Sequence, residues 1–575
     1  MTLAAFDSVS VALCGSGGSG VMTAANMLLD AAAASGYYAL FGRSSGPQIR
    51  GGEAAGMLRL SPRQVTSVDD VTDILLAIDW QNVQRFAAEL PLAPSSLIVA
   101  DPAAGDIPEA LARSGARVAH LPMKDLAKQV PDGRANMVAV GAMAALVGLP
   151  INALADVLGK SLKKKHADAL DASLAAARLG AEAAAALGPA KRLAPPCPAA
   201  GRWTITGNQA VGLGAVKGGI RFVAAYPITP ATEVLEWLSS ALPKIGGAFV
   251  QAEDELASIN MCLGASFGGV PALTATSGPG LALMIEALGL SVASETPVVV
   301  VDVQRGGPST GIPTKSEQAD LDIAIHGLHG DAPHLVVAPQ STADCLFTTQ
   351  WAVHLAETLQ APCLVLSDQA LGQARAIIDA PPDTTFAGGR RLAEGGEAYR
   401  RYAVTESGVS PMALPGMEGL QYTADGLEHS ETGTPSSQAA DHAAQLDKRN
   451  RKLAEHDYGD PWAVVEGDGE IAVVTWGSCT GAAREAVERA RAQGVAARLV
   501  ALRLLSPALP AAMARALAGV KSVLVVEQSH SGQFHKYLRA EYDLPARVDS
   551  LHRPGPLPIR PAEVVARLLA LGGAA

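Results

Sequence analysis

Short apolar segments rich in β-branched residues alternate with longer segments of helical periodicity over much of the chain. In residues 203–380 the short segments are RFVAAYP, GAFVQAE, PALTATS, TPVVVVDVQ, HLVVAPQ and APCLVLS. The segments between them are rich in alanine and glycine and long enough for helices. Strands that alternate with helices in this way predict a parallel, doubly wound sheet.

The same alternation occurs on both sides of this region. Near the N-terminus the strand-like VSVALCGS is followed by a glycine turn, a predicted helix over residues 20–36 and a second strand, YYALFG. Near the C-terminus the strand-like segments are EIAVVTWGS, ARLVALRLL and SVLVVEQS, with a helix such as AAREAVERARAQG between them. The pattern predicts an α/β protein built from several doubly wound parallel-sheet domains.

Two stretches without periodicity divide the chain. The Pro/Ala-rich GPAKRLAPPCPAAGR predicts an interdomain linker over residues 188–202. Residues 381–462 form a polar segment without a regular pattern. This segment is too long for an ordinary loop, which indicates a connecting segment, a lid or a contact surface. We therefore expect three domains, over residues 1–187, 203–380 and 463–575.

Composition narrows the functional classes. The chain has 575 residues, of which 49% are hydrophobic and 18% charged, as expected for several well-buried domains. The net charge is −11 and no basic tract is present, which argues against nucleic acid as a main partner. The opening residues carry no basic segment or cleavage pattern, and no apolar run is long enough to span a membrane. We expect a cytoplasmic protein.

The six cysteines form no local cluster, and no two of them have C-x-x-C spacing. An iron–sulfur cluster or a structural zinc site needs such a group of ligands. If the chemistry requires a cluster, we expect another chain to carry it.

A glycine-rich turn, CGSGGSGVM, follows the first predicted strand. Gly15, Gly17 and Gly20 satisfy the G-x-G-x-x-G spacing, with Gly18 between them, and this spacing brings a backbone close to a phosphate at a helix N-terminus. The acidic residue that holds the ribose of NAD is absent about 20 positions later, where Arg43 lies. The turn indicates either a contact with another phosphate-bearing ligand or a tight turn with no ligand. Arg50, beside a glycine pair, is either a second phosphate contact or a surface arginine.

Three successive strand ends of the central region carry polar side chains suited to a site. Thr229 lies between two prolines in YPITPATE, Glu255 lies on the apolar stripe of a predicted helix, and Arg305 precedes a Gly-Gly-Pro loop. Ligands bind beyond the carboxyl ends of strands in open α/β sheets, and arginine suits carboxylate binding. Each residue alone also fits a turn, a helix start or a surface loop. Ser277, Gly278 and Gly280 add a tight turn that can face a cofactor.

These strings resemble the 2-oxoacid:ferredoxin oxidoreductases. The resemblance rests on YPITPATE, EDELASINMCLGASFGG, TSGPGLALM, QRGGPSTGIPTKSEQADL and the preceding GNQAVGLGAVKGG. GSGGSGV and GPQIRGG resemble the family's γ-type domain, here fused ahead of an α-type part. The RGGPSTGIPTK loop and the fused arrangement are most similar to the 2-oxoglutarate-type subunits.

The resemblance implies a function for each candidate residue. Glu255 is expected to hydrogen-bond the aminopyrimidine of thiamine diphosphate, and Ser277 and Gly278 are expected to contact the cofactor. Thr229, Arg305 and Thr314 are expected to bind the substrate. Gly15, Gly17, Gly18, Gly20 and Arg50 are the expected contacts with coenzyme A.

The resemblance also implies a fold and partners. Residues 203–380 are expected to form a pyrimidine-type domain of thiamine diphosphate enzymes, and residues 463–575 a domain like the transketolase C-terminal domain. A β subunit is expected to hold most of the thiamine diphosphate with Mg2+ and a [4Fe–4S] cluster, in an (αβ)2 heterotetramer that passes electrons to ferredoxin.

The implied reaction converts 2-oxoglutarate and coenzyme A to succinyl-CoA and carbon dioxide, or runs in reverse as a carboxylation. Alternatives remain open. The same chemistry on pyruvate or on a branched-chain or aryl 2-oxoacid is one, and a non-catalytic assembly or coenzyme A-binding subunit is another. A third interpretation, that the chain is an NAD-dependent dehydrogenase, is supported by the N-terminal glycines alone.

Overall fold

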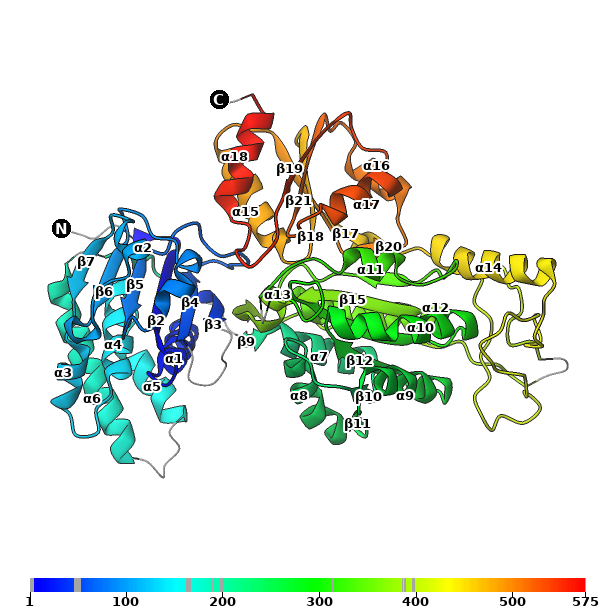
Figure 1. The fold of residues 1–575 in the computed structure, drawn as a ribbon, viewed down its shortest axis with the longest axis horizontal. Helices are drawn as coiled ribbons and strands as arrows, with labels where there is room; N and C mark the ends of the chain where they lie inside the picture. Colours follow the sequence, from blue (N-terminus) through cyan, green and yellow to red (C-terminus); the bar gives the residue numbers. More distant parts are fainter. Residues whose placement is uncertain are drawn as a thin grey trace. The chain divides into compact units, whose positions relative to one another are not determined.

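A computed structural model describes residues 5–45, 53–161, 167–188, 190–196, 201–312, 315–384, 386, 389–395 and 399–573. Its contacts divide the chain into two compact units, which are described separately below (Figure 1). The first unit comprises Met1–Ile205 with Gln373–Pro382, and the second comprises Thr206–Gly372 with Asp383–Ala575.

The first unit is built on an eight-stranded mixed sheet in the order β7-β6-β5-β2-β4-β3-β16-β9. Its strands are β2 (Val9–Ser16), β3 (Tyr38–Ser45), β4 (Glu53–Ser61), β5 (Ile74–Ala77), β6 (Leu97–Ala100), β7 (Arg117–His120), β9 (Arg202–Thr206) and β16 (Arg375–Asp379). The pairs among β2, β5, β6 and β7 are parallel, whereas the pairs among β2, β4, β3 and β16 are antiparallel. A two-stranded parallel ribbon joins β1 (Ala5–Phe6) and β8 (Arg192–Leu193).

The antiparallel half of this sheet differs from the expected doubly wound pattern. β3 ends at Ser45 and β4 begins at Glu53, and strands joined by so short a connection pair antiparallel because a parallel return needs a longer crossover. β16 lies within the predicted central range, residues 203–380, yet it extends the first unit's sheet by pairing with β3. The helices of this unit are α1 (Val21–Ala34), α2 (Glu109–Ala112), α3 (Met123–Lys128), α4 (Ala135–Val147), α5 (Ile151–Ser161) and α6 (Ala167–Ala184).

The second unit contains the predicted parallel sheet, in the order β11-β10-β12-β13-β15-β14-β20. All six strands predicted for this region are present: β10 (Phe222–Ala225), β11 (Ala248–Gln251), β12 (Ala272–Thr276), β13 (Val298–Gln304), β14 (Leu335–Val337) and β15 (Pro362–Asp368). Every pair among these six strands is parallel. The seventh strand, β20 (Leu504–Ser506), pairs antiparallel with β14.

Small residues bring the helices of this unit close together. A Cβ on Gly218 of α7 would lie 2.7 Å from the Cβ of Val353 on α12, so only glycine permits this approach of the two helices. The helices are α7 (Gly207–Gly218), α8 (Thr232–Ala241), α9 (Glu255–Phe267), α10 (Gly278–Ser294), α11 (Leu321–His326), α12 (Asp344–Leu359) and α13 (Gln369–Gln373).

A five-stranded sheet near the C-terminus has the order β17-β19-β18-β21-β22, and all of its pairs are parallel except β17–β19. Its strands are β17 (Ala463–Glu466), β18 (Ile471–Trp476), β19 (Ala497–Leu502), β21 (Ser522–Glu527) and β22 (Arg547–His552). Its helices are α15 (Cys479–Ala492), α16 (Pro510–Ala516), α17 (Gln533–Glu541) and α18 (Pro561–Leu571). The prediction of several α/β domains with mainly parallel sheets is thus confirmed, with the antiparallel strands as additions.

Gln318 ties the central sheet's arginine loop to this C-terminal sheet. Its backbone N–H donates to the Gln528 carbonyl at 2.8 Å, and its Nε2 donates to the Trp476 carbonyl at 2.9 Å. Its Oε1 accepts the Gln528 N–H at 2.8 Å. The segment that returns from the Arg305 loop is therefore held by main-chain groups of two C-terminal strand ends.

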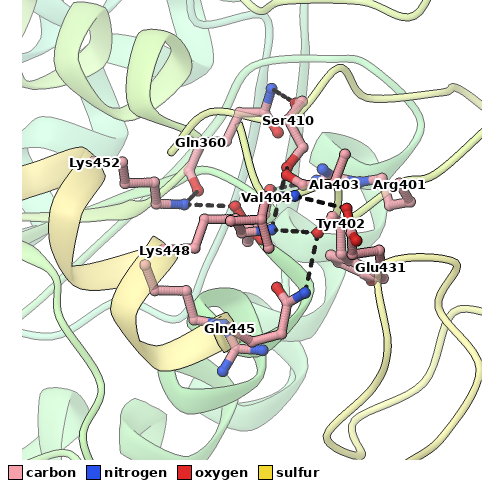
Figure 2. A network of polar contacts seen from close by, with 12 residues as sticks. Gln360, Arg401, Tyr402, Ala403, Val404, Ser410, Glu431, Gln445, Lys448 and Lys452 are labelled. Atoms are coloured by element: carbon pink, nitrogen blue, oxygen red, sulfur yellow. Dashed lines mark hydrogen bonds and ion pairs between the residues drawn. The ribbon is translucent and has the colours of Figure 1, made fainter. Parts of the chain in front are cut away.

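The segment over residues 381–462 is irregular over most of its length, as predicted, but it ends in a helix, α14 (Ala439–Ala454), drawn in yellow in Figure 1. Polar side chains of α14 reach inward to main-chain oxygens of this segment. Gln445 Nε2 and Lys448 Nζ both donate to the Tyr402 carbonyl, each at 3.0 Å (Figure 2). Lys452 Nζ donates to the Gln360 carbonyl at 2.9 Å. Buried hydrogen bonds thus hold a stretch that has little apolar core of its own.

Glu295, at the C-terminal end of α10, is the anion at the centre of this polar network. Lys448 Nζ lies 2.6 Å from its Oε1 and Lys452 Nζ lies 2.9 Å from its Oε2, and all three side chains are buried. Arg401 Nη2 donates to the Glu295 carbonyl at 2.8 Å. Burial alone would raise the pKa of Glu295, but the charges of Lys452, Lys448 and Arg401 outweigh it and hold the pKa well below its usual range.

Replacing Glu295 with Gln is expected to destabilise the second unit by about 3–5 kcal/mol, because two buried ammonium groups lose their counter-ion. Urea unfolding measures the change. Glu470→Gln removes the exposed partner of Lys521 and is expected to cost less than about 1 kcal/mol. A lowered carboxyl pKa stabilises the folded state above the unfolded pKa of about 4.3, so the advantage of the wild type over Glu295→Gln shrinks as pH falls below that value. Equal costs for both substitutions would contradict this assignment.

Among the residues that the structure describes, no helix has both the length and the hydropathy needed to cross a membrane.

Candidate active site

The ends of β10 and β13 are joined by one hydrogen bond. Arg305 directly follows β13, and its Nη1 donates to the carbonyl oxygen of Thr229, in the loop after β10, at 2.7 Å. The same loop is fixed from α7, where Asn208 Nδ2 donates to the Pro230 carbonyl at 3.1 Å. β12 separates these two strands in the sheet, so the bond spans its carboxyl end. The structure therefore places Thr229 and Arg305 together.

Glu255 is the first residue of α9, which follows β11. Asp254 caps this helix by accepting the Ala257 N–H at 2.7 Å. Glu255 is buried on the face of α9 that also carries Ile259, as the four-residue spacing between them predicts. No residue in the described part of the chain forms a hydrogen bond or ion pair with the Glu255 carboxylate. A buried carboxylate without a protein partner is expected to interact with a ligand.

The turn that starts α10 lies against Glu255. A Cβ on Gly280 would overlap Thr276 Oγ1 and lie 2.9 Å from Glu255 Oε1, so the glycine is required by the close approach of this turn. Ser277 precedes the helix as its N-cap residue, and its buried Oγ has no hydrogen-bond partner among the described residues. Glu255 and the Ser277–Gly278 turn are thus neighbours at one edge of the sheet.

Asp320 connects the two halves of the site. Its Oδ1 and Oδ2 lie 2.6 Å and 2.7 Å from where a Cβ on Gly278 would be, so its carboxyl group lies against the first residue of α10. Burial is the main cause that raises the pKa of Asp320, to about 6, and the positive charge of Arg305 opposes this rise. All three predicted strand ends therefore converge on one edge of the central sheet.

Sequence reasoning missed three residues that shape this edge: Asn208, Asp302 and Asp320. Asp302 was recognisable as a single charge within an otherwise apolar strand, TPVVVVDVQ. Gly280 was recognised as part of the turn before α10 but was not assigned a contact. Asn208 and Asp320 carried no local signal, because their importance depends on contacts across the fold.

In the first unit, the glycine turn joins β2 to α1 as predicted. Gly15 is in β2, Gly17 and Gly18 lie in the turn, and Gly20 precedes α1 with φ +84°. Because Gly20 has no side chain, the N-terminal N–H groups of α1 receive no side-chain cap. Uncapped N–H groups at a helix N-terminus suit an anion.

Asp79, which follows β5, already occupies one side of this turn. Its Oδ1 accepts the Ser16 N–H at 2.9 Å and its Oδ2 accepts the Ser16 hydroxyl at 2.8 Å. The carboxylate repels a phosphate near Ser16, so the favourable position for an anion is the start of α1.

The strand order of the first unit opposes the dehydrogenase alternative. In a dinucleotide-binding fold the strand after the first helix lies parallel beside the first strand, and its end holds the ribose. Here β4 separates β3 from β2, and β3 and β4 pair antiparallel. The position of a ribose-binding acid is therefore lost together with the acid itself.

Two predicted site residues, Arg50 and Thr314, lie outside the described residues. Within the ranges that are described, no group of three or more His, Cys, Asp and Glu side chains is placed to hold a metal ion.

Comparisons with known proteins assign the chain to a family. Three family models match it: a pyruvate flavodoxin/ferredoxin oxidoreductase thiamine diphosphate-binding domain over residues 213–448, a pyruvate ferredoxin/flavodoxin oxidoreductase domain over residues 10–183, and core domain II of pyruvate:ferredoxin oxidoreductase over residues 469–563. The 2-oxoacid:ferredoxin oxidoreductase 2 α subunit of Aeropyrum pernix is 31% identical over 92% of this chain and 93% of its own length.

Two further relatives carry a substrate in their names. The 2-oxoglutarate synthase subunit KorA of Methanothermobacter thermautotrophicus is 36% identical over 64% of this chain and 97% of its own length. The solved structure of 2-oxoglutarate:ferredoxin oxidoreductase from Magnetococcus marinus, with 2-oxoglutarate, coenzyme A and succinyl-CoA bound, is 37% identical. It matches with a TM-score of 0.92 over 98% of this chain and 99% of its own.

The chain belongs to the 2-oxoacid:ferredoxin oxidoreductases, and it is an α subunit of that family of enzymes. The expected family and the expected class of oxidoreductase are confirmed.

The residues of the central site fit thiamine diphosphate, whose binding domain the family match covers. Glu255 presents a buried carboxylate that no described residue engages. The buried Ser277 hydroxyl, which has no hydrogen-bond partner among the described residues, is a second polar group available to a ligand. Both groups are of the kind that hold a hydrogen-bonding heterocycle in a protein site.

Substituting Ala for Gly280 is expected to displace Glu255 and destabilise the chain by about 1–3 kcal/mol, because the new methyl group overlaps Thr276 and crowds the carboxylate. Gly264, in the neighbouring helix α9, is the matched control because a Cβ there meets nothing within 4 Å. Gly264→Ala is expected to be neutral or stabilising by up to about 1 kcal/mol. Denaturant unfolding of both variants measures the difference. A Gly280→Ala chain as stable as Gly264→Ala would show that the approach is looser than the structure indicates.

Proposed function

We propose that this chain is the α subunit of a 2-oxoglutarate:ferredoxin oxidoreductase. The enzyme converts 2-oxoglutarate and coenzyme A to succinyl-CoA and carbon dioxide and passes the electrons to ferredoxin, or runs the reverse carboxylation. The observation that carries the proposal is the placement of Thr229, Glu255 and Arg305 at one sheet edge of a chain 37% identical to a 2-oxoglutarate enzyme.

Glu255 is the residue proposed to hold and move a proton. Thiamine diphosphate supplies the nucleophilic carbon and the electron sink for decarboxylation when it is bound. The Glu255 carboxylate, at the start of α9 and without a hydrogen-bond partner among the described residues, is proposed to hydrogen-bond a ring nitrogen of the cofactor's aminopyrimidine. The Ser277–Gly278 turn is the proposed second contact with the cofactor.

Arg305 and Thr229 are the residues proposed to bind the substrate. One guanidinium nitrogen of Arg305 is used to hold the loop through the Thr229 carbonyl, which leaves the other edge of the planar group for a carboxylate. The Thr229 hydroxyl is the proposed neighbouring donor. Thr314, nine residues after Arg305, stays a prediction as a further substrate contact.

The choice of 2-oxoglutarate over other 2-oxoacids is supported by two similar proteins named for it and by the RGGPSTGIPTK form of the arginine loop. The same chemistry on pyruvate or on a branched-chain or aryl 2-oxoacid remains the second candidate, because the similar Aeropyrum pernix subunit is named for 2-oxoacids in general.

Coenzyme A is proposed to contact the first unit at the start of α1. The uncapped helix N-terminus and the side-chain-free Gly17, Gly18 and Gly20 support a phosphate there, whereas Asp79 opposes one beside Gly15 and Ser16. Arg50 is the proposed cation. The similar Magnetococcus marinus enzyme has coenzyme A bound.

A β subunit is proposed to complete the enzyme. We expect it to hold most of the thiamine diphosphate with Mg2+ and to carry a [4Fe–4S] cluster, in an (αβ)2 assembly that reduces ferredoxin. The term α subunit in the names of similar proteins supports a further subunit. The cytoplasm, where coenzyme A is available, is the proposed compartment.

The proposal is tested by reduction of a dye or ferredoxin under anaerobic conditions, using the chain co-expressed with its partner and a panel of 2-oxoacids with and without coenzyme A. Reduction by 2-oxoglutarate that requires coenzyme A is the expected result. Preference for pyruvate or a branched acid would refute the substrate and keep the chemistry. No reduction with any acid, from a complex shown to contain thiamine diphosphate and cluster, would favour a non-catalytic subunit.

A Glu255→Gln enzyme is expected to lose about 10²–10⁴-fold in turnover, because the amide cannot exchange the proton that a carboxylate can. Glu253→Gln, two residues earlier and exposed, is the matched control and is expected to retain wild-type turnover. Steady-state rates are compared after size-exclusion chromatography shows that both complexes are intact. Wild-type turnover in Glu255→Gln would remove Glu255 from the mechanism.

A further inference from the structure

The helices α9 and α10 carry the proposed cofactor contacts at their N-terminal ends. Glu255 is the first residue of α9, and Ser277 is the N-cap residue of α10. The opposite ends of these helices, Phe267 and Ser294, lie one helix length away and meet residues 381–462. A helix is held together by its own backbone hydrogen bonds, and packed interiors transmit displacements. Contacts at one end of each helix therefore affect the position of the other end.

Arg390 holds the C-terminal end of α9. Its Nε and Nη2 form a bidentate pair with the Glu357 carboxylate of α12, at 2.9 Å each, and both side chains are buried. Its Nη1 donates to the Ser266 carbonyl, and its Nη2 donates to the hydroxyl of the same residue at 3.1 Å. Nη1 also meets Met412 Sδ at 3.6 Å. Five acceptor atoms thus match the five N–H groups of the guanidinium, a geometry that lysine cannot reproduce.

The string GVSPMALPG, residues 408–416, packs against the same end of α9. Gly269, two residues beyond the helix, has φ +91°, and a Cβ there would lie 2.7 Å from Leu414 Cδ1. Two backbone hydrogen bonds of 2.9 Å join Met412 to residues 391–393. This string is therefore fixed next to the arginine that holds α9.

Side chains of the same segment complete the C-terminal end of α10. The last four carbonyl groups of an α-helix have no partner within the helix. In α10 the Ser291 and Val292 carbonyls accept N–H groups of the turn that follows. The Ala293 and Ser294 carbonyls accept side-chain donors from residues 381–462. The segment thus acts as part of the cap of α10.

Two of these donors are cations. Arg401 Nη2 donates to the carbonyl of the last helical residue at 3.2 Å and to the Glu295 carbonyl at 2.8 Å. Arg449 Nη2 donates to the Ala293 carbonyl at 3.4 Å, and His429 Nε2 lies 3.1 Å from the same oxygen. Cations near the C-terminus of a helix interact favourably with the helix dipole. The carbonyl groups at the end of α10 therefore help to stabilise the buried cations around Glu295.

We propose that the segment over residues 381–462 is a clamp that fixes the C-terminal ends of α9 and α10 and thereby positions Glu255 and Ser277 for the cofactor. Arg390 and Arg401 are its positioning residues, because they act on the site through the two helices. The contacts with the helix ends stand on this chain alone, whereas the consequence for the cofactor rests on the proposed function.

Arg390→Lys and Arg401→Lys test the clamp in the complex with the partner subunit. Lysine keeps the positive charge but cannot reach two acceptors with a planar fork. Arg451→Lys is the matched control, because the hydrogen bonds of Arg451 go to the Glu406 and Thr405 carbonyls within the segment, at 3.2 Å and 2.9 Å. Size-exclusion chromatography first shows that each complex is intact.

Both clamp variants are expected to bind thiamine diphosphate about tenfold more weakly, because a displaced Glu255 loses a charged hydrogen bond to the cofactor. Isothermal titration calorimetry on the cofactor-free complex measures the dissociation constant without turnover. Arg451→Lys is expected to keep the affinity of the wild type. Wild-type affinity in both clamp variants would overturn the clamp, whatever their turnover.

A double-mutant cycle shows whether Arg390 acts through Glu255. In the wild-type background Arg390→Lys is expected to lower kcat by about 10- to 100-fold, because a small displacement of a reacting group is costly. In the Glu255→Gln background the same substitution is expected to have little further effect, because the group that it positions is already lost. Equal fold-losses in the two backgrounds would contradict the positioning role.

The outcomes separate the clamp from the proposed function. Wild-type turnover in Glu255→Gln would refute the role of Glu255, and cofactor affinity then decides the clamp. Preference for pyruvate would refute the substrate and leave both measurements valid. If Arg390→Lys does not assemble, the affinity of Arg401→Lys decides. A wild-type complex that binds no thiamine diphosphate would refute the cofactor proposal and the clamp with it.

Discussion

The hydrogen bond from Arg305 to the Thr229 carbonyl is the constraint on which the candidate site depends. The carboxyl ends of parallel strands lie at the same edge of a sheet, but the loops that follow them must still be fixed relative to one another. This bond links the loops after β10 and β13 across the end of β12, and it fixes the guanidinium by one edge. The remaining contacts, from Asn208 on one side and Gln318 on the other, hold the loops that the bond joins.

Buried carboxyl groups at two places in the second unit have different surroundings. Around Glu295 cations outnumber the anion, and the carboxylate stays ionised because two ammonium groups contact it. Asp302 in β13 is also fully buried, but neither of its carboxyl oxygens has a hydrogen-bond partner among the described residues, and burial raises its pKa. The first arrangement fastens the segment over residues 381–462 to α10. The second lies in the strand that ends at Arg305.

The strands, and the position of the three candidate residues at one sheet edge, followed from the sequence because their signals are local. The apolar runs that form β10 to β15 are continuous, and Thr229, Glu255 and Arg305 each lie just beyond one of them. The pairing of β16 with β3 was not predictable, because β16 is separated from the first unit by the whole central sheet in sequence. The helix α14 was missed because its inward face carries Gln445, Lys448 and Lys452 in place of apolar residues.

The central claim is that Arg305 offers its free edge to a carboxylate of the substrate. Steady-state kinetics of Arg305→Ala with 2-oxoglutarate test it most directly, in a complex whose thiamine diphosphate content is first shown to be unchanged. Loss of a charged partner costs about 2–5 kcal/mol, so kcat/KM is predicted to fall at least about 30-fold. Partial recovery on adding guanidinium ion is also predicted. A kcat/KM close to that of the wild type would contradict the account.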